Sequence, residues 1–285
     1  MRLLILPAAV LMQLCLGATY SWSVYVRPLR DLTGLGQGPV QLPFAVFYFV
    51  FPATMVFAGS FLRRWGPGRC ALVGGLLFGG GWVTASLGKV HFAWTVLGIG
   101  GLAGVGAGLA YVVPIATCIR WFPRHKGLVT GVAVAGFGGG AALVSQVGGA
   151  WLAAGATPFG VFRAFGIAFL AVVAAASLVM RNPPGTRLGD EPRVQARGVW
   201  ADPRFRLLYL AMFAGLAAGF TVNANLKELS PLGASALGVT AVALFAVGNA
   251  AGRIAWGVLF DRFGGPRTVP ANLAAQAVLL VAAPW

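Results

Sequence analysis

Nine long runs of apolar residues, separated by short polar connections, make up most of this sequence of 285 residues. Only 9% of the residues are charged, against about a quarter in a soluble domain. A helical run of about 20 apolar residues matches the thickness of the apolar core of a bilayer. We therefore expect an all-α, polytopic membrane protein whose spans cover residues 3–27, 40–62, 70–88, 92–119, 127–153, 160–180, 205–227, 235–260 and 269–285.

Positive charge is concentrated in alternate connections between these runs. With the membrane-embedded Arg253 set aside, fifteen of the Lys and Arg residues lie on one side and five on the other. Because Lys and Arg are enriched in cytoplasmic loops, this distribution predicts a cell (inner) membrane protein with a cytoplasmic N-terminus. The net charge of +15 could suit a nucleic-acid partner, but its division among short loops argues against one.

A sequence repeat indicates two halves built on one plan. Four residues recur at a constant offset of 198 positions: Gly59, Arg64, Gly66 and Arg69 match Gly257, Arg262, Gly264 and Arg267. A stretch rich in Pro and Arg separates the two copies, as expected of a solvated linker. We therefore predict an N-terminal six-helix half at 1–180, a cytoplasmic linker at 181–206 and a partial C-terminal half at 207–285, with parallel repeats as in known transporters.

One full positive charge, Arg253, lies inside the eighth apolar run. The next acid, Asp261, marks the expected water boundary eight residues later, so the backbone of Arg253 is about 12 Å inside a bilayer core about 30 Å thick. A charge at that depth costs roughly 2.5–3.5 kcal/mol and indicates a functional site. The alternatives are that Arg253 snorkels to the interface or pairs with a buried group. No Asp or Glu lies within a predicted span to pair with it.

The few other polar side chains within the spans predict a cavity around this arginine. Asn249 lies one turn before Arg253 on the same helical face. The remaining polar candidates are Gln13, Tyr20, Gln41, Tyr48, Tyr111, Ser145, Gln146, Asn223 and Asn225. Each alone is more often an interhelical hydrogen bond. Together with Arg253 they predict an anion site, and the planar guanidinium favours a small carboxylate as the ligand.

No pattern in the sequence predicts an enzyme, a cofactor or a metal site. Only six acids and two His residues are present, and Cys15, Cys70 and Cys118 suggest no disulfide framework. The run Gly136–Ala141 formally fits a nucleotide-binding fingerprint, but no strand precedes it. Rows of small residues every fourth position, such as Gly100, Gly104 and Gly108, instead predict close helix packing. The expected partners are small carboxylate anions and the lipid bilayer.

Several stretches resemble known transporter motifs. Gly257–Arg267 matches the inter-helix loop of the major facilitator superfamily, G-x-x-x-D-R-x-G-x-x-R, with Asp261 and Arg262 in place. The first copy departs from the motif, because Arg63 stands where the acid is expected. Gln13–Tyr25 resembles the first helix of the oxalate/formate antiporter family, Gly104–Tyr111 with Arg120–Gly127 resembles its fourth helix and following loop, and Arg181–Gly185 resembles the end of its sixth helix.

This resemblance implies a twelve-helix secondary active carrier that exchanges small carboxylates by alternating access. It implies that Arg253 holds the substrate carboxylate and that Tyr20, Gln41 and Tyr111 line the site. A second cation on helix eleven has no counterpart, so the resemblance also implies a chain that is truncated after the ninth of twelve helices. A proton-coupled lactate or pyruvate carrier and a non-transporting membrane sensor or fragment remain as alternatives.

Overall fold

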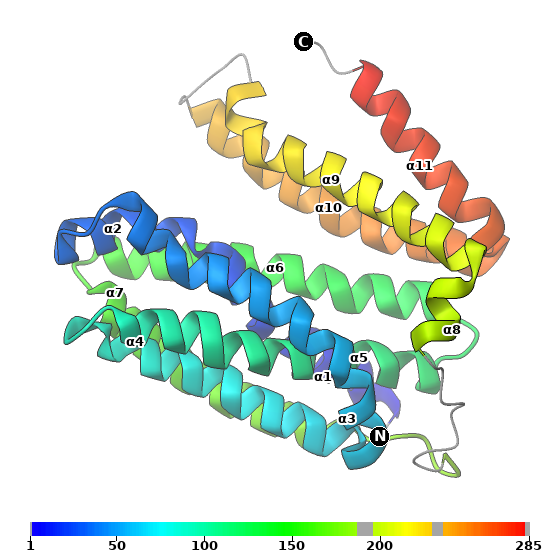
Figure 1. The fold of residues 1–285 in the computed structure, drawn as a ribbon, viewed down its shortest axis with the longest axis horizontal. Helices are drawn as coiled ribbons and strands as arrows, with labels where there is room; N and C mark the ends of the chain where they lie inside the picture. Colours follow the sequence, from blue (N-terminus) through cyan, green and yellow to red (C-terminus); the bar gives the residue numbers. More distant parts are fainter. Residues whose placement is uncertain (1, 187–195, 230–235, 283–285) are drawn as a thin grey trace.

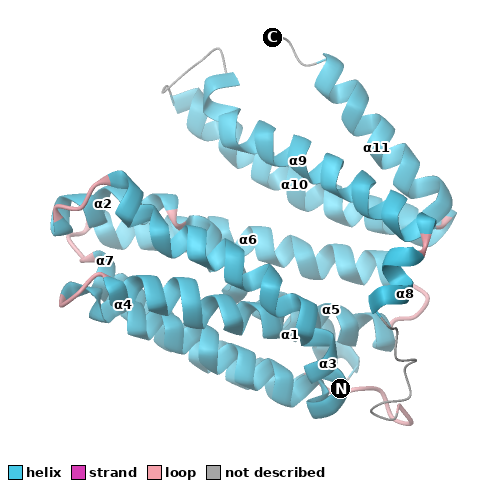
Figure 2. Ribbon diagram, in the orientation of Figure 1, coloured by secondary structure: helices cyan, strands magenta, loops and turns pink. Residues whose placement is uncertain are grey.

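The computed structural model describes residues 2–186, 196–229 and 236–282, with side chains for all of these except 196–197 and 218–246. Throughout these ranges the chain consists of helices and their connections, and they contain no strand. The predicted all-α fold is therefore confirmed. Figures 1 and 2 show the long helices lying alongside one another, with the connections gathered at the two ends of the bundle.

The first part of the chain forms five long helical stretches that are apolar enough to cross a membrane. These candidate spans are Arg2–Ser21, Gln37–Lys89, Ala93–Trp121, Lys126–Ala153 and Pro158–Val179. The second stretch contains two predicted spans, because α3 (Gln37–Ala85) is broken at Gly66, where φ is 77° and ψ is 167°. Every one of the first six predicted spans therefore corresponds to helical structure, with boundaries shifted by a few residues.

Two of the predicted spans are irregular. Predicted span one is made of α1 (Arg2–Leu16), the 3-10 turn η1 (Gly17–Ser21) and α2 (Ser23–Thr33). Predicted span four follows η2 (Ser86–Lys89) and is made of α4 (Ala93–Thr95), the π-helical stretch η3 (Val96–Ala103) and α5 (Gly104–Trp121). Irregular backbone at membrane depth is tolerated where it is buried in protein or lines a cavity. Both irregular stretches lie against other helices of the bundle.

The remaining helices complete the order seen in Figure 1. They are α6 (Lys126–Ala153), α7 (Pro158–Val179), α8 (Ala196–Ala201), α9 (Pro203–Leu229), α10 (Ala236–Phe263) and α11 (Gly265–Ala282). The last three correspond to the seventh, eighth and ninth predicted spans. Figure 1 shows α6 between the N-terminal helices and α10, with α9, α10 and α11 diverging from α6 away from the end that carries α8.

The sequence repeat is also a structural repeat at its glycines. Gly66 and Gly264, which occupy equivalent positions, have φ values of 77° and 76°. A residue with a side chain adopts this left-handed conformation only at an energetic cost, whereas glycine does so readily. Each glycine marks a break between two helical segments, within α3 in the first copy and between α10 and α11 in the second.

Glycine rows allow the helices to pack closely, as predicted. Successive glycines meet successive residues of α3: Gly100 meets Val46, Gly104 meets Val50 and Gly108 meets Thr54. In each case a Cβ on the glycine would come within 3.0 Å of the facing side chain. Small residues therefore set the distance between η3–α5 and the part of α3 that precedes Gly66.

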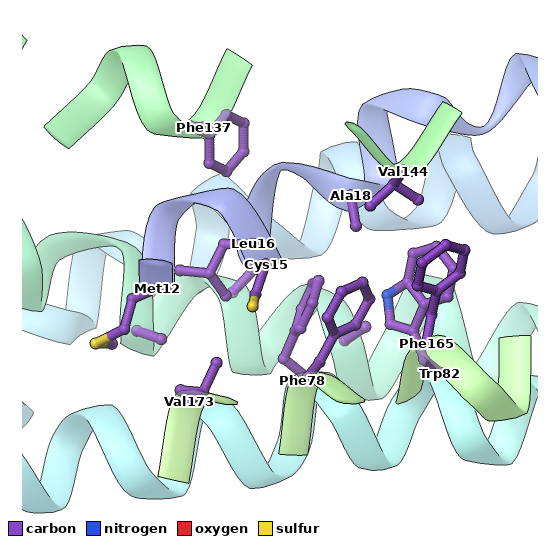
Figure 3. Close-up of a cluster of buried hydrophobic side chains, with 14 of the residues drawn as sticks. Met12, Cys15, Leu16, Ala18, Phe78, Trp82, Phe137, Val144, Phe165 and Val173 are labelled. Atoms are coloured by element: carbon purple, nitrogen blue, oxygen red, sulfur yellow. The ribbon is translucent and has the colours of Figure 1, made fainter. Parts of the chain in front are cut away.

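Large aromatic side chains fill the interior between α7 and the part of α3 that follows Gly66. Trp82 is completely buried, and its ring centroid lies 5.4 Å from that of Phe169 and 5.7 Å from that of Phe162. Figure 3 shows Trp82, Phe78 and Phe165 packed on one side of α1, with Phe137 of α6 on its other side. The buried core thus fixes α1 between two groups of helices.

Candidate functional site

Arg253 lies in α10, ten residues before the helix ends at Phe263, or about 15 Å along the axis. Its Nε donates a 2.8 Å hydrogen bond to Oδ1 of Asn249, so the predicted pairing of these residues on one face is confirmed. Both side chains are exposed. Within the described part of the chain, no carboxylate lies within ion-pair distance of Arg253.

Five aromatic residues, which we call the aromatic cluster, gather from four helical segments. They are Tyr20 of η1, Tyr48 and Phe51 of α3, Tyr111 of α5 and Phe137 of α6. The ring of Phe137 meets those of Tyr20 and Tyr111 edge to face, with both centroid distances 5.2 Å. Tyr48 contacts Tyr20 at 5.5 Å, and Phe51 contacts Tyr111 at 5.5 Å. Such edge-to-face contacts each stabilise the arrangement by about 0.5–1.5 kcal/mol.

Close backbone packing holds Tyr20 in this cluster. The helix of the first span tightens to a 3-10 turn at Gly17, where a Cβ would overlap the carbonyl group of Phe137. Three residues further along α6, Gly140 meets the carbonyl of Leu14 in the same way. The first span and α6 therefore touch through their backbones at Phe137 and again three residues beyond it, which leaves the rings of Tyr20 and Phe137 little freedom to separate.

Gln13 ties the first span to α5 beneath the cluster. Its side chain is completely buried, and its Nε2 donates a 3.2 Å hydrogen bond to the backbone carbonyl of Tyr111. The Oε1 atom of the same amide is buried and makes no hydrogen bond within the described residues. Gln13 thus holds the backbone of Tyr111 in place. The ring of Tyr111 contacts Phe51 and Phe137.

Arg253 lies on the helix that packs against α6, which carries Phe137 of the aromatic cluster. The two helices touch, because a Cβ on Gly131 of α6 would overlap the backbone carbonyl of Arg253. The described part of the chain therefore places an exposed cation on α10 and a partly buried group of aromatic rings on the helices next to it.

The structure brings together some of the predicted site residues and not others. Tyr20 and Tyr111 both contact Phe137, and Arg253 donates a hydrogen bond to Asn249. Gln41 is half-buried in α3, about two turns before Tyr48, and no hydrogen bond or ring contact among the described residues joins it to the cluster. No such contact is present for Ser145 or Gln146, and the side chains of Asn223 and Asn225 lie outside the described residues.

Phe51 and Phe137 are members of the cluster that sequence reasoning missed. Phe137 is hidden in a run of glycines that suggested helix packing alone. It is, however, the only aromatic residue between Gly127 and Gly149, and such isolation on a glycine-rich helix is a usable signal. Phe51 has no comparable signal, because it follows Phe44, Phe47, Tyr48 and Phe49 in a stretch crowded with aromatic rings.

The second copy of the loop motif connects α10 to α6. The carboxylate of Asp261 accepts hydrogen bonds from the backbone N–H groups of Gly127, at 2.7 Å, and Leu128, at 2.8 Å. These donors belong to the first turn of α6, where backbone N–H groups lack partners within the helix and the helix dipole favours an anion. Gly127 and Gly257 allow this contact, since a Cβ on either would overlap the carbonyl of the other.

Within the described ranges, the first copy of the motif makes no equivalent contact. Arg63, which replaces the acid, donates a 3.2 Å hydrogen bond from Nη2 to Oγ of Ser60 one turn earlier. Gly59 has only the side chain of Arg63 near it. The motif arginines Arg64, Arg69, Arg262 and Arg267 are all exposed, and Arg262 stacks over the ring of Phe263. Among the residues that the structure describes, the motif acid of the second copy accepts interhelical hydrogen bonds and the first copy has no counterpart to it.

Comparison with known proteins agrees with this architecture. The model of the Major Facilitator Superfamily matches residues 8–285. The oxalate:formate antiporter of Oxalobacter formigenes is 28% identical over 97% of this chain and 67% of its own length. The MFS-type transporter YhjX of Escherichia coli is 24% identical over 99% of this chain and 72% of its own. The apicoplast pyruvate carrier 1 of Toxoplasma gondii is 26% identical over 90% of this chain.

The chain spans 66–72% of the length of these three relatives. Its helical architecture and its apolar spans agree with the family that the comparison identifies. The chain belongs to the major facilitator superfamily and is an all-α, polytopic membrane protein.

Proposed function

We propose that this protein is a secondary active transporter of small carboxylates and that Arg253 binds the carboxylate. The observation that carries the proposal is an exposed arginine deep in α10, whose backbone packs against α6 and which has no carboxylate partner within the described residues. An unpaired guanidinium near the middle of a bilayer costs roughly 2.5–3.5 kcal/mol. A carboxylate that accepts two parallel hydrogen bonds from it offsets that cost.

Two relatives support a carboxylate as the substrate. One is named an oxalate:formate antiporter and another a pyruvate carrier. Oxalate, formate and pyruvate share a carboxylate and a small, flat shape that suits a site between a guanidinium and aromatic rings. The pyruvate carrier also favours a second candidate function, a proton-coupled monocarboxylate carrier. The two candidates differ in whether a proton gradient drives uptake when no carboxylate is present on the other side.

The contact between α6 and α10 supports transport by alternating access. Asp261 and the glycine pair Gly127 and Gly257 hold the two helices together at one end, and Figure 1 shows their ribbons diverging toward the other. From the distribution of Lys and Arg, we infer that the held end lies on the cytoplasmic side of the cell membrane. The site then faces outward, and release of this contact would let it face inward.

We further propose that residues 1–180 and 207–285 move as separate units joined by the linker at 181–206. The beginning of this linker is attached to the end of α5. Nε1 of Trp121 donates a 2.7 Å hydrogen bond to the carbonyl of Arg181, and Nη1 of Arg120 donates a 2.8 Å hydrogen bond to Oδ1 of Asn182. The linker thus starts from a fixed point on the N-terminal unit.

Transport and binding can be measured separately to test the proposed function. The purified protein is reconstituted in proteoliposomes, and uptake of labelled oxalate, formate or pyruvate is followed with and without unlabelled carboxylate inside. We expect saturable uptake that internal carboxylate accelerates. Acceleration by an inward proton gradient alone would favour the second candidate function. Binding without any flux would identify a membrane sensor, and the absence of both would refute a carboxylate site.

A further inference from the structure

We propose that the outer surface of the helix pair α3–α7 binds an anionic phospholipid, whose phosphate is held by Arg69 and Arg181. The site lies at the end of the bundle where α7 ends and the part of α3 after its break begins. Arg253 lies on a different helix, α10, so the inference does not rest on the proposed carboxylate site.

Helix α7 and the part of α3 that follows Gly66 pack closely against each other. A Cβ on Gly68 would come 3.1 Å from the carbonyl oxygen of Met180, and a Cβ on Gly75 would overlap the side chain of Val173. Contacts that advance along α3 while they go back along α7 show that the two helices are antiparallel. The end of α7 and the beginning of this part of α3 are therefore fixed side by side.

An arginine directly follows each partner of the contact between Gly68 and Met180. These are Arg69 and Arg181, and both are exposed. Within the described ranges, neither makes an ion pair. Because their backbones are adjacent and arginine side chains are long, both guanidinium groups can reach one anion that lies between them. Two guanidinium groups on one phosphate is a favourable arrangement, since each can donate two parallel hydrogen bonds.

The position of Arg181 is held from two directions. Nε1 of Trp121 in α5 donates a 2.7 Å hydrogen bond to the carbonyl of Arg181, which fixes its backbone. Its own Nε donates a 3.1 Å hydrogen bond to the carbonyl of Leu178, one turn earlier in α7. This bond directs the side chain back along the helix and leaves the outer nitrogens of the guanidinium available to a ligand.

Exposed leucines continue the surface from both arginines toward the middle of the membrane. Leu72 and Leu76 follow Arg69 by about one and two turns of α3, and Leu178 precedes Arg181 by about one turn of α7. Their side chains are 36%, 50% and 68% exposed. A ligand with a charged head and apolar chains fits a surface of this kind, because burial of its chains adds to the binding of its phosphate.

Aromatic residues indicate that the two arginines lie at the depth of the lipid headgroups. Trp65 is 38% exposed just before the break in α3, and Trp121 is half-buried at the end of α5. Trp side chains are enriched at the interface between membrane and water. Figure 1 shows α8 and the start of the chain at this same end of the bundle, which we infer to be cytoplasmic.

The charge of the site favours an anionic lipid over a zwitterionic one. No Asp or Glu occurs between residues 32 and 189, so the sequence of this half supplies no acid to offset its arginines. The ammonium group of phosphatidylcholine would add a positive charge beside Arg69 and Arg181. Phosphatidylglycerol instead presents hydroxyl groups there and keeps its net negative charge. Basic sites between membrane helices on the cytoplasmic side commonly bind such headgroups.

Titration of lipids onto the purified full chain in detergent, followed by native mass spectrometry, measures this preference. Phosphatidylglycerol and phosphatidylcholine with identical acyl chains are compared, together with soluble glycerol phosphate. We expect phosphatidylglycerol to bind at least about tenfold more tightly than phosphatidylcholine, because two arginines act on its charge. Glycerol phosphate should bind more weakly than phosphatidylglycerol, because it lacks the apolar chains.

Substitutions assign the preference to the two arginines. Arg69→Gln and Arg181→Gln should each weaken binding of phosphatidylglycerol by about fivefold and leave that of phosphatidylcholine nearly unchanged. Arg163→Gln is the matched control, since Arg163 is exposed near the other end of the same helix, α7. It should have no effect. Leu76→Asn should weaken binding of both lipids and leave that of glycerol phosphate unchanged.

The outcomes separate a lipid from other ligands and from the proposed function. Equal affinity for the two lipids would overturn the inference without the need for any variant. Folded Arg69→Gln and Arg181→Gln proteins that keep the full preference would overturn it too, as would an equal loss in Arg163→Gln. Glycerol phosphate that binds as tightly as phosphatidylglycerol would identify a free phosphate as the ligand and refute a lipid site. Carboxylate binding should be unchanged in Arg69→Gln, so failure of this inference leaves the proposed function in place.

Discussion

Gly131 of α6 lies directly against the backbone carbonyl of Arg253 in α10, so that a Cβ at position 131 would overlap that oxygen. The contact makes the position of the proposed ligand-binding arginine depend on the distance between the two helices. The same helix pair is also joined at its end by Asp261. Under the proposed function, binding of a ligand and movement of the two helices would therefore be linked.

Replacing Gly131 tests this link. Gly131→Ala forces α6 and α10 apart, and overpacking of this kind typically costs about 1–3 kcal/mol. We expect carboxylate affinity and flux to fall by about tenfold because Arg253 is displaced. Gly138→Ala is the control on the same helix, since a Cβ there meets nothing within 4 Å. Equal effects of the two substitutions on the dissociation constant would contradict the link.

Arg253 itself provides the most direct test of the binding site. Arg253→Ala removes hydrogen bonds to a charged group, each of which contributes about 1.5–3 kcal/mol. We expect carboxylate affinity to fall ten- to a hundredfold or more, with partial recovery in Arg253→Lys, which keeps the charge but loses the planar fork. Titration of the purified variants by calorimetry measures this, and the exposed Arg163 offers a control substitution to Ala.

Expression levels distinguish this function from a structural role of Arg253. Removal of a charge from the middle of a span eases membrane insertion, so neither variant should be produced in smaller amounts. A structural arginine would give the reverse pattern, with poor folding and normal affinity in the protein that survives. A well-folded Arg253→Ala protein with unchanged affinity would refute the proposed role.

We expect Asp261 to stabilise the end of the molecule at which α6 and α10 are held together. Asp261→Asn removes the negative charge at the first turn of α6 and one of the two acceptor oxygens, so the contact with Gly127 and Leu128 weakens. We expect the distance between spin labels on α6 and α10 near this end to increase in at least about half of the molecules. Electron paramagnetic resonance measures that distribution.

An acid elsewhere in the chain provides the control for Asp261. Asp31 makes an ion pair with Arg27 at 3.9 Å, and both side chains are largely exposed, at 73% and 92%. Exposed pairs of this kind contribute about 0–1 kcal/mol. Asp31→Asn should therefore leave the distance distribution unchanged. If Asp261→Asn behaves in the same way, the contact with α6 does not hold the end closed.

The orientation in the membrane is tested by labelling single cysteines. In a background without Cys15, Cys70 and Cys118, a cysteine replaces either Gly36 or Arg124, both of which are exposed in connections between spans. The distribution of positive charge places Gly36 outside and Arg124 inside. An impermeant maleimide should label the first variant in intact cells and the second only after lysis. The opposite result would invert the proposed topology.

Much of the fold could be predicted from local features of the sequence. Apolar runs located the helices to within a few residues, because length and hydropathy are properties of a segment alone. The left-handed glycines Gly66 and Gly264 were recognisable as a repeat for a similar reason. The pairing of Asn249 with Arg253 followed from helical spacing. The 3-10 turn η1 and the π-helical stretch η3 were not predicted, since neighbouring helices rather than local preference support them.

The candidate site was less accessible to sequence reasoning because its contacts join distant segments. Phe137 belongs to the aromatic cluster because α6 packs against the first span and α5, and the sequence does not show that packing. Asp261 reaches Gly127 across 134 residues, and no periodicity encodes such a contact. Gln41 and Tyr48 share one helical face, yet Tyr48 alone reaches the cluster, because Gln41 lies two turns nearer the end of α3.

The charge of Arg253 has a consequence for the response of this protein to membrane voltage. Under the proposed function, the site carries one positive charge when it is empty and none when a monocarboxylate is bound. A potential of 100 mV changes the energy of a unit charge that crosses the full membrane by about 2.3 kcal/mol. Voltage therefore acts on the return of the empty carrier and leaves the loaded step nearly unaffected, so exchange between two loaded forms should proceed at almost the same rate in energised and de-energised vesicles.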